Sequence, residues 1–148
     1  IDICDIVISK DAIEHDMDVT ALGYERGVIP DMDNSVFHSD SRLFDVAVKS
    51  IEEANLSVKV FTGRVVSGDQ FIAGKEKKDD LVNTFAGDCA EMEGASIAHA
   101  AYVNNIPCLI IRAISDKADG SAEMDYPTFE KKAAANSIKI LKQLIKNL

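Results

Sequence analysis

Two acidic residues stand where apolar stretches of the chain end, and either could take part in acid–base chemistry. Glu93 lies within CAEMEGASIAHAAY, residues 89–102, and Asp116 follows Ser115 at the end of CLIIRAIS. Free backbone N–H groups and the helix dipole favour a carboxylate at the start of a helix, so the local sequence alone favours a plain N-terminal charge at Glu93. For Asp116 it leaves an Asx turn or helix cap and a functional acid equally open.

The residues around Glu93 and Asp116 favour a shared site. Arg112 lies inside an apolar run and would be costly to bury unpaired, so we expect it to meet a carboxylate, with Glu93 as the natural partner. Gly94 and the small residues after it leave room for a ligand close to the backbone. One helix and one strand separate the two acids, the length of a unit that returns the chain to an adjacent parallel strand. Both acids are therefore predicted to line one rim.

Other candidate residues carry weaker signals. In SGDQFIAG the ring of Phe71 could stack on a planar ligand, although a place in the core is equally compatible with the sequence. His15, Asp16 and Asp18 in HDMD could suggest a metal, but without a second group of ligands we predict no metal site. His99, within a helical pattern, is predicted to serve packing or to face solvent, and the lysines of KEKK are predicted to form a solvated face.

Strand-like and helical patterns alternate along the chain and predict an α/β fold with a mixed, largely parallel sheet flanked by helices. The expected strands cover residues 3–9, 57–68, 88–92 and 107–115, the last of them buried. The expected helices cover residues 40–54, 75–87, 94–104 and about 127 to the end, with Gly87 closing the second. The final helix carries an apolar stripe opposed by lysines; its members are Phe129, Ala134, Ile138, Leu141, Ile145 and Leu148.

Composition narrows the class of protein. With 148 residues, 47% of them hydrophobic, we expect one globular domain over residues 1–148. The net charge of −9 disfavours binding to nucleic acid. The longest apolar run is too short to cross a bilayer and no signal segment is recognisable, so we expect a cytoplasmic protein without membrane contact. The widely spaced Cys4, Cys89 and Cys108 are interpreted as reduced packing residues.

Four stretches together carry a resemblance to a known family. They are VSGDQFIAG, AEMEGASIAHAAY, IPCLIIRAISDKAD and HDMDVTALGYERGVIP. In this order, and over essentially the whole chain, they resemble the bacterial 5'-methylthioadenosine/S-adenosylhomocysteine nucleosidases of the purine nucleoside phosphorylase-like superfamily. The resemblance implies a nucleoside phosphorylase-like fold. It also implies hydrolysis of the bond between adenine and a 5'-thio-substituted ribose, without a cofactor or a metal.

The resemblance also implies roles for particular residues. Asp116 matches the acid that protonates a purine ring nitrogen, and Glu93, with Met92 before it, matches the residue that holds the ribose hydroxyls. Ser115 and Arg112 match supports of that pair. The other matched positions are Phe71 and the backbone of Ile72 at the adenine, and Tyr126 beside the ribose and thio group. Val19, Leu22 and Pro30 match residues that reach across a homodimer interface to the partner's 5'-substituent, with Leu22 in place of a more usual aromatic.

The front of the chain departs from the family pattern. Family members are longer, and their additional part carries the first strands, a glycine-rich turn and the glutamate that activates water. We therefore expect these residues to be the C-terminal two-thirds of such a domain, within a fragment or processed portion of a complete enzyme; alone, the chain would be inactive or completed by another polypeptide. A phosphate-dependent purine nucleoside phosphorylase and a noncatalytic nucleoside-binding domain stay open as alternatives.

Overall fold

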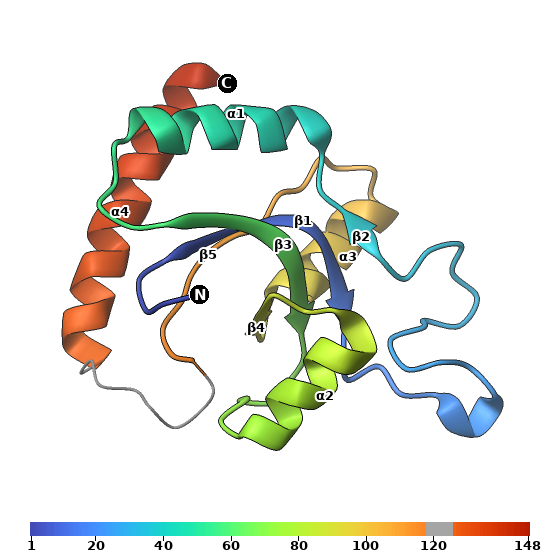
Figure 1. Ribbon diagram of the computed structural model, residues 1–148. Coiled ribbons are helices and arrows are strands. Elements are labelled where there is room, and N and C mark those ends of the chain that lie inside the picture. The colour runs from blue at the N-terminus through green and yellow to red at the C-terminus, as the bar shows by residue number, and fades with distance from the viewer. Residues whose placement is uncertain (118–125) are drawn as a thin grey trace.

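A mixed sheet forms the centre of the computed structural model, which describes residues 1–117 and 126–148. Strands β1 (Ile6–Glu14), β3 (Val60–Ser67) and β4 (Cys89–Glu91) run parallel to one another in that spatial order. Two short strands, β2 (Phe37–His38) and β5 (Ile111–Ala113), pair antiparallel with different parts of β1. The predicted class, a mixed and largely parallel α/β sheet, is confirmed (Figure 1).

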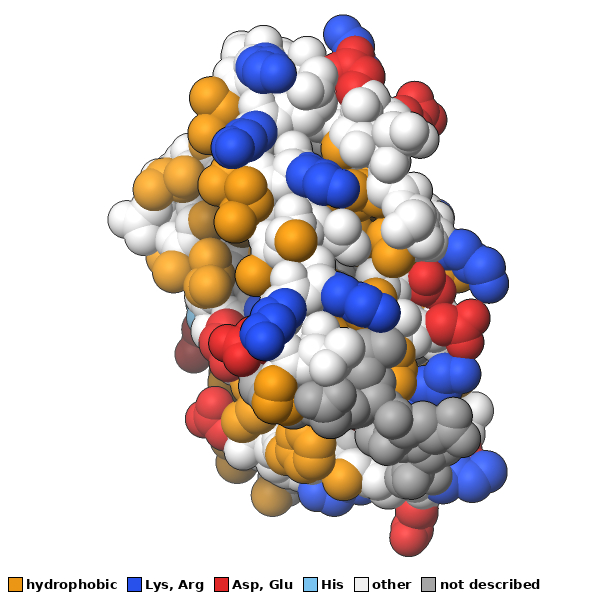
Figure 2. Space-filling view, turned by 90° about the vertical axis from the view of Figure 1, so that its left-hand side faces the viewer, with side chains coloured by type: hydrophobic (Ala, Val, Ile, Leu, Met, Phe, Trp, Pro, Cys, Tyr) orange, Lys and Arg blue, Asp and Glu red, His pale blue; other side chains and the backbone are white. Residues whose placement is uncertain are grey.

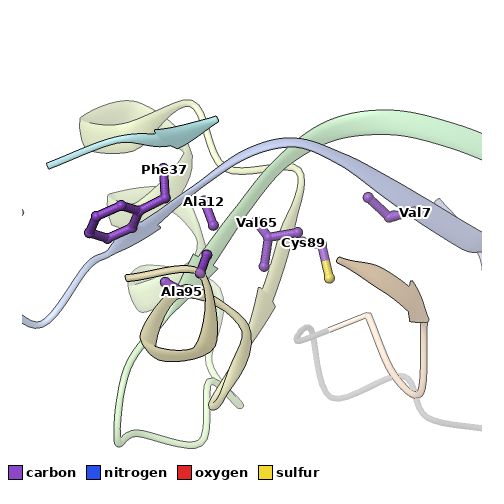
Figure 3. Close-up of a cluster of buried hydrophobic side chains, with 7 residues drawn as sticks. Val7, Ala12, Phe37, Val65, Cys89 and Ala95 are labelled. Carbon is purple, nitrogen blue, oxygen red and sulfur yellow. The ribbon is translucent and has the colours of Figure 1, made fainter. Parts of the chain in front are cut away.

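Helices cover both faces of this sheet. On one face Ile6 and Ile8 of β1 pack with α1 (Ser41–Glu53) and α4 (Tyr126–Asn147). On the other face Val7 packs with β3, β4 and α3 (Gly94–Val103), in the cluster drawn in Figure 3. Helix α2 (Lys75–Phe85) covers the ends of β1 and β3. Neighbouring residues of β1 pack on opposite faces because successive side chains of a strand point to opposite sides of the sheet.

A β-bulge changes the side of the sheet to which β1 directs its residues. The register with β3 shifts between Ser9 and Asp11. Val7 and Ala12 therefore share one cluster although five positions separate them, an odd spacing that would otherwise put them on opposite faces. The strand continues to Glu14, whereas the sequence predicted its end at residue 9. Polar residues in this part of the sequence indicated a loop. The strand can continue through them because Asp11 is paired with Arg64 of β3 at 2.6 Å.

The predicted helices form close to their expected positions, with one difference at the end of α2. Ala86, rather than the predicted Gly87, adopts the left-handed conformation that closes this helix, with φ of 53°. Gly87 is required for a different reason. A Cβ there would lie 2.9 Å from a methyl group of Val66, so only glycine lets the chain pass this close to β3.

Helix α4 docks through a different face from the predicted one. Phe129 and Ile140 are buried, whereas Ala134 is exposed. The exposed fractions of the other predicted stripe residues all exceed one half: Ile138 53%, Leu141 57%, Ile145 65% and Leu148 54%. Figure 2 shows hydrophobic side chains among lysines on this side of the molecule. Ile140 and Leu144 form the docked apolar face, and polar contacts to α1 flank it: Asn147 donates to Ser50 and Gln143 donates to Glu53.

The predicted last strand differs in partner, direction and burial. It was expected to be buried and to lie parallel beside the strand that precedes Glu93. Instead β5 runs antiparallel along the start of β1, with Ala113 opposite Ile6 and Ile111 opposite Ile8, and its residues are half-buried. After α3 the chain turns at Asn105, a residue with φ of 55°, and runs back along the edge of β1. Across the described ranges, no helix is long and apolar enough to span a membrane.

Candidate active site

One cavity of about 630 Å³ brings most of the predicted site residues together. It lies between the loop after β3, the junction of β4 with α3, and the segment after β5. The predicted residues on its wall are Phe71, Ile72, Met92, Glu93, Arg112, Ser115 and Asp116. The side chain of Tyr126, at the start of α4, lies outside the described residues.

The three residues predicted to serve a partner subunit lie elsewhere. Val19, Leu22 and Pro30 belong to the connection between β1 and β2, which includes the short 3-10 helix η1 (Thr20–Leu22). None of them lines the cavity among the described residues. The side chain of Leu22 is 73% exposed, and Figure 1 shows this connection projecting from the sheet.

A buried carboxylate that the sequence reasoning missed, Glu91, also lines the cavity. Only 4% of the side chain of Glu91, the last residue of β4, is exposed. The hydroxyl of Ser67 donates to Glu91, and the N–H of Gly94 lies 2.8 Å from both carboxylate oxygens. The N–H of Ala95 donates in turn to the Ser67 hydroxyl at 2.7 Å. Glu91 and Ser67 together satisfy the first backbone donors of α3.

Glu91 therefore has the role that the local sequence suggested for Glu93. Glu93 occupies the N-cap position of α3, but among described residues its side chain makes no capping hydrogen bond and is 61% exposed at the cavity. The space at Gly94 was predicted to admit a ligand. A Cβ there would lie 3.0 Å from a Glu91 carboxylate oxygen, so the glycine accommodates Glu91 instead.

Arg112 links the two carboxylates. Its Nη2 atom lies 3.4 Å from Oε2 of Glu93, which confirms the predicted pair, and its Nε atom lies 3.6 Å from Oε2 of Glu91. Nothing in the local sequence distinguishes the two glutamates, since both flank Met92. The signal that separates them is the strand register, which places Glu91 directly opposite Ser67.

The loop after β3 presents Phe71 to solvent and anchors Ile72 in the core. Phe71 is 71% exposed, which excludes a place in the core, whereas Ile72 is 8% exposed and packs with Leu81 and Phe85. An exposed aromatic ring on a cavity wall can stack on a planar ligand. The fixed position of Ile72 holds the loop that carries this ring.

The residues of the HDMD stretch support the loop after β3. Asp16 accepts a 2.7 Å hydrogen bond from the N–H of Asp69, and a Cβ at Gly68 would lie 2.7 Å from the buried His15 ring. Burial lowers the pKa of His15. Asp18 accepts hydrogen bonds from the N–H and the hydroxyl of Thr20, the first residue of η1. Among the described side chains, no group of three or more His, Cys, Asp or Glu could hold a metal ion.

The segment after β5 carries the second acid. The Ser115 hydroxyl donates to Oδ2 of Asp116 at 3.0 Å. Lys78 of α2 donates to the carbonyl of Lys117 at 2.9 Å, which ties this segment to the helix that follows the Phe71 loop. Cys89 also lines the cavity, but burial raises the pKa of its thiol to about 11, which disfavours a nucleophilic thiolate at neutral pH. The acids on this wall can exchange protons or accept hydrogen bonds from hydroxyls.

A protein-family model described as "Phosphorylase superfamily" matches residues 1–146. The chain belongs to the phosphorylase superfamily. Within this superfamily, a 5'-methylthioadenosine/S-adenosylhomocysteine nucleosidase of Staphylococcus aureus strain JH9 is 39% identical over 145 residues. The match covers 97% of this chain and 62% of that protein, so the chain spans less than two thirds of that relative.

Solved structures of the superfamily have the same fold. The nucleosidase of Neisseria meningitidis, in complex with methylthio-immucillin-A, gives a TM-score of 0.90 at 36% identity over the whole of this chain and 64% of its own. The futalosine hydrolase of Helicobacter pylori gives a TM-score of 0.89 at 33% identity, over 100% of this chain and 62% of its own. The resemblance drawn from the sequence motifs and the predicted nucleoside phosphorylase-like fold are thereby confirmed.

Proposed function

We propose that the complete protein hydrolyses the N-glycosidic bond of 5'-methylthioadenosine and S-adenosylhomocysteine, releasing adenine and the thioribose. The observation that carries this proposal is one cavity wall that combines an acid, Asp116, with an aromatic ring, Phe71, and an arginine-linked carboxylate, Glu93. Relatives named as nucleosidases of these two compounds support it.

In the proposed reaction the bond between the sugar carbon and the purine nitrogen breaks, and its electron pair leaves with the purine. Asp116 donates a proton to a purine ring nitrogen, because adenine leaves poorly as an anion. General acid catalysis of this kind contributes about 10²–10⁴-fold to a rate. Glu93 accepts hydrogen bonds from the ribose hydroxyls and stabilises the positive charge that develops on the sugar. Water adds its oxygen to the sugar carbon and gives a proton to a base, which by resemblance is a glutamate of the upstream part.

The other residues of the cavity have supporting roles in this proposal. Ser115 orients Asp116 through their hydrogen bond, and Arg112 orients Glu93. Phe71 stacks on adenine while the backbone of Ile72 contacts its edge. Met92 lies beside the ribose, and Tyr126 is assigned to the ribose and thio group.

The proposal extends to the organisation of the whole protein. Residues 1–148 are assigned to one domain, as its C-terminal two-thirds, in a cytoplasmic homodimer. Val19, Leu22 and Pro30 would contact the partner's 5'-substituent. The exposure of Leu22 supports a role outside its own chain. Sedimentation of the complete protein tests this assignment, since a monomer at assay concentration would contradict it.

The direct test incubates the complete protein, expressed from its full open reading frame, with 5'-methylthioadenosine in phosphate-free buffer. Release of adenine with free thioribose is the expected result. S-adenosylhomocysteine and futalosine serve as parallel substrates. Adenosine binding without turnover of any substrate would refute the proposal and favour a noncatalytic nucleoside-binding protein.

A phosphorylase is the second candidate, since the matching family is described by that activity. Such an enzyme needs cations for phosphate, and those on the described cavity wall have partners. Arg112 faces two carboxylates, Lys78 donates to a carbonyl, and Lys117 pairs with Asp2 at 2.8 Å. This pairing favours hydrolysis. Strict dependence on phosphate with a sugar-1-phosphate product would select the phosphorylase instead.

A further inference from the structure

The junction between β4 and α3 offers two partners that attract a carboxylate. The first is the N-terminus of α3, where backbone N–H groups lack carbonyl partners within the helix. The second is the guanidinium of Arg112. Glu91 and Glu93 both reach this junction, because they stand on either side of Met92.

Glu91 occupies the helix terminus and shares Arg112 with Glu93. Its carboxylate accepts from Gly94 N–H at 2.8 Å and from Glu93 N–H at 3.3 Å, and it lies 3.6 Å from Arg112 Nε. The carboxylate of Glu93 contacts Nη2 of Arg112, at 3.4 Å. Glu93 thus keeps acceptor capacity that faces the cavity.

Removal of Glu91 would reverse this arrangement. Buried N–H groups left without an acceptor are unfavourable, and so is a guanidinium that has lost one of two carboxylates. Glu93 stands at the N-cap, the position whose side chain normally accepts from the first turn of a helix. It is therefore the nearest replacement, and occupying that place turns its carboxylate away from the cavity.

We propose that Glu91 is a positioning residue that keeps Glu93 available to the ribose by occupying the helix terminus in its place, while Arg112 contacts both carboxylates. The identity of what Glu93 binds rests on the proposed function; the orientation of Glu93 does not. Glu91 itself is assigned no contact with the substrate.

The kinetic test measures a specificity ratio in the complete protein. It compares kcat/KM for 5'-methylthioadenosine with kcat/KM for its 2'-deoxy analogue, which lacks one hydroxyl that Glu93 would hold. In Glu91→Gln an amide NH2 replaces one acceptor and faces the donors of Gly94 and Arg112. We expect the ratio to fall by about tenfold or more, the range for a hydrogen bond to a charged group. Adding Glu93→Gln to this variant is expected to lower the ratio little further.

The controls separate positioning from a structural role. Asp11→Asn removes another carboxylate that is bonded to an arginine, Arg64, and Asp11 does not line the described cavity. It is expected to leave the ratio unchanged. If Glu91→Gln lowers kcat/KM equally for 5'-methylthioadenosine and for its 2'-deoxy analogue, so that the ratio is unchanged, the proposal is overturned. If that variant does not fold, Gly94→Ala displaces the Glu91 carboxylate sterically and is expected to lower the same ratio.

A structural readout is independent of turnover. In crystals of Glu91→Gln, or of Gly94→Ala if the first does not fold, we expect the Glu93 carboxylate within hydrogen-bond distance of a first-turn N–H of α3. A carboxylate that still faces the cavity would overturn the proposal even if the enzyme is active. Failure of the wild-type protein to release adenine would instead refute the proposed function and leave this structural result to decide the orientation.

Discussion

The floor and the rim of the cavity are built in opposite ways. We define the floor as Ser67, Glu91 and the first turn of α3, and the rim as the side chains of Phe71, Met92, Glu93, Ser115 and Asp116. In the floor, Glu91 is 4% exposed and bonded to a hydroxyl and to backbone N–H groups. On the rim, Phe71 is 71% and Glu93 61% exposed.

This difference separates stability from chemistry. A buried polar group whose partners all lie within the protein contributes to folding, and its loss leaves those partners unsatisfied. An exposed side chain on a cavity wall contributes little to folding and retains bonding capacity for a ligand. Substitutions in the floor should therefore change the free energy of unfolding, and at Glu91 they should also act on specificity through Glu93. Substitutions on the rim should change turnover or binding with little effect on unfolding.

The largest expected effect on the rim comes from Asp116→Asn, which removes the proposed proton donor. Adenine release should fall by about 10²–10⁴-fold, the contribution of general acid catalysis. Substrate binding and the thermal midpoint should change little. A turnover assay measures adenine release, and calorimetric titration of the same preparation measures substrate binding. Full activity in this variant would refute the acid role.

In the floor, Ser67→Ala removes a hydroxyl that donates to Glu91 and accepts from the N–H of Ala95. Both partners are buried, so the free energy of unfolding should fall by about 1–3 kcal/mol. Ser115→Ala on the rim is the matched control and should shift the free energy of unfolding by less than about 0.5 kcal/mol. Urea denaturation compares the two, and equal shifts would remove the distinction between floor and rim.

Phe71→Ala sharpens the comparison with a residue that should affect binding alone. Loss of an aromatic contact of about 0.5–1.5 kcal/mol should raise KM for 5'-methylthioadenosine by about two- to tenfold. The unfolding free energy should barely change, because the ring is already exposed. Phe85→Ala, at a side chain that is 4% exposed, is the control and should destabilise the fold by about 3–5 kcal/mol. An unchanged KM in Phe71→Ala would exclude stacking.

The smallest effect concerns His15, which supports the loop between floor and rim. Burial lowers the pKa of His15 in the folded protein below its ordinary value of 6.5. The unfolded chain therefore binds the proton more readily, and stability that is fully present above that value is lost as the pH falls below it. The thermal midpoint should drop less on acidification in His15→Gln than in the wild type. His38→Gln, at an exposed position, is the control. If the drop of the thermal midpoint on acidification is the same in His15→Gln and in His38→Gln, the assignment to burial is contradicted.

The sequence predicts the rim better than the floor. Arg112 within an apolar run required a carboxylate, and the pair with Glu93 follows from that requirement. Glu91 could not be distinguished from Glu93 because the distinction depends on strand register, which is a tertiary property. The same limit applies to β5, whose partner strand was wrongly predicted from the length of the helix and strand that separate the two acids. In α4 the apolar residues occupy more than one face, and the face that docks is the one that combines Ile140 and Leu144 with polar contacts of Gln143 and Asn147 to α1, a tertiary match that the helix sequence alone does not contain.

In the proposed complex, Asp116 and Glu93 face opposite ends of one adenine nucleoside while Glu91 remains in the floor. The most direct measurement is a crystal structure of the complete Asp116→Asn protein with 5'-methylthioadenosine. We expect a purine ring nitrogen within hydrogen-bond distance of the substituted amide side chain at position 116, ribose hydroxyls on Glu93, and Glu91 still bonded to Gly94. Ribose hydroxyls on Glu91, or a purine bound away from position 116, would contradict it.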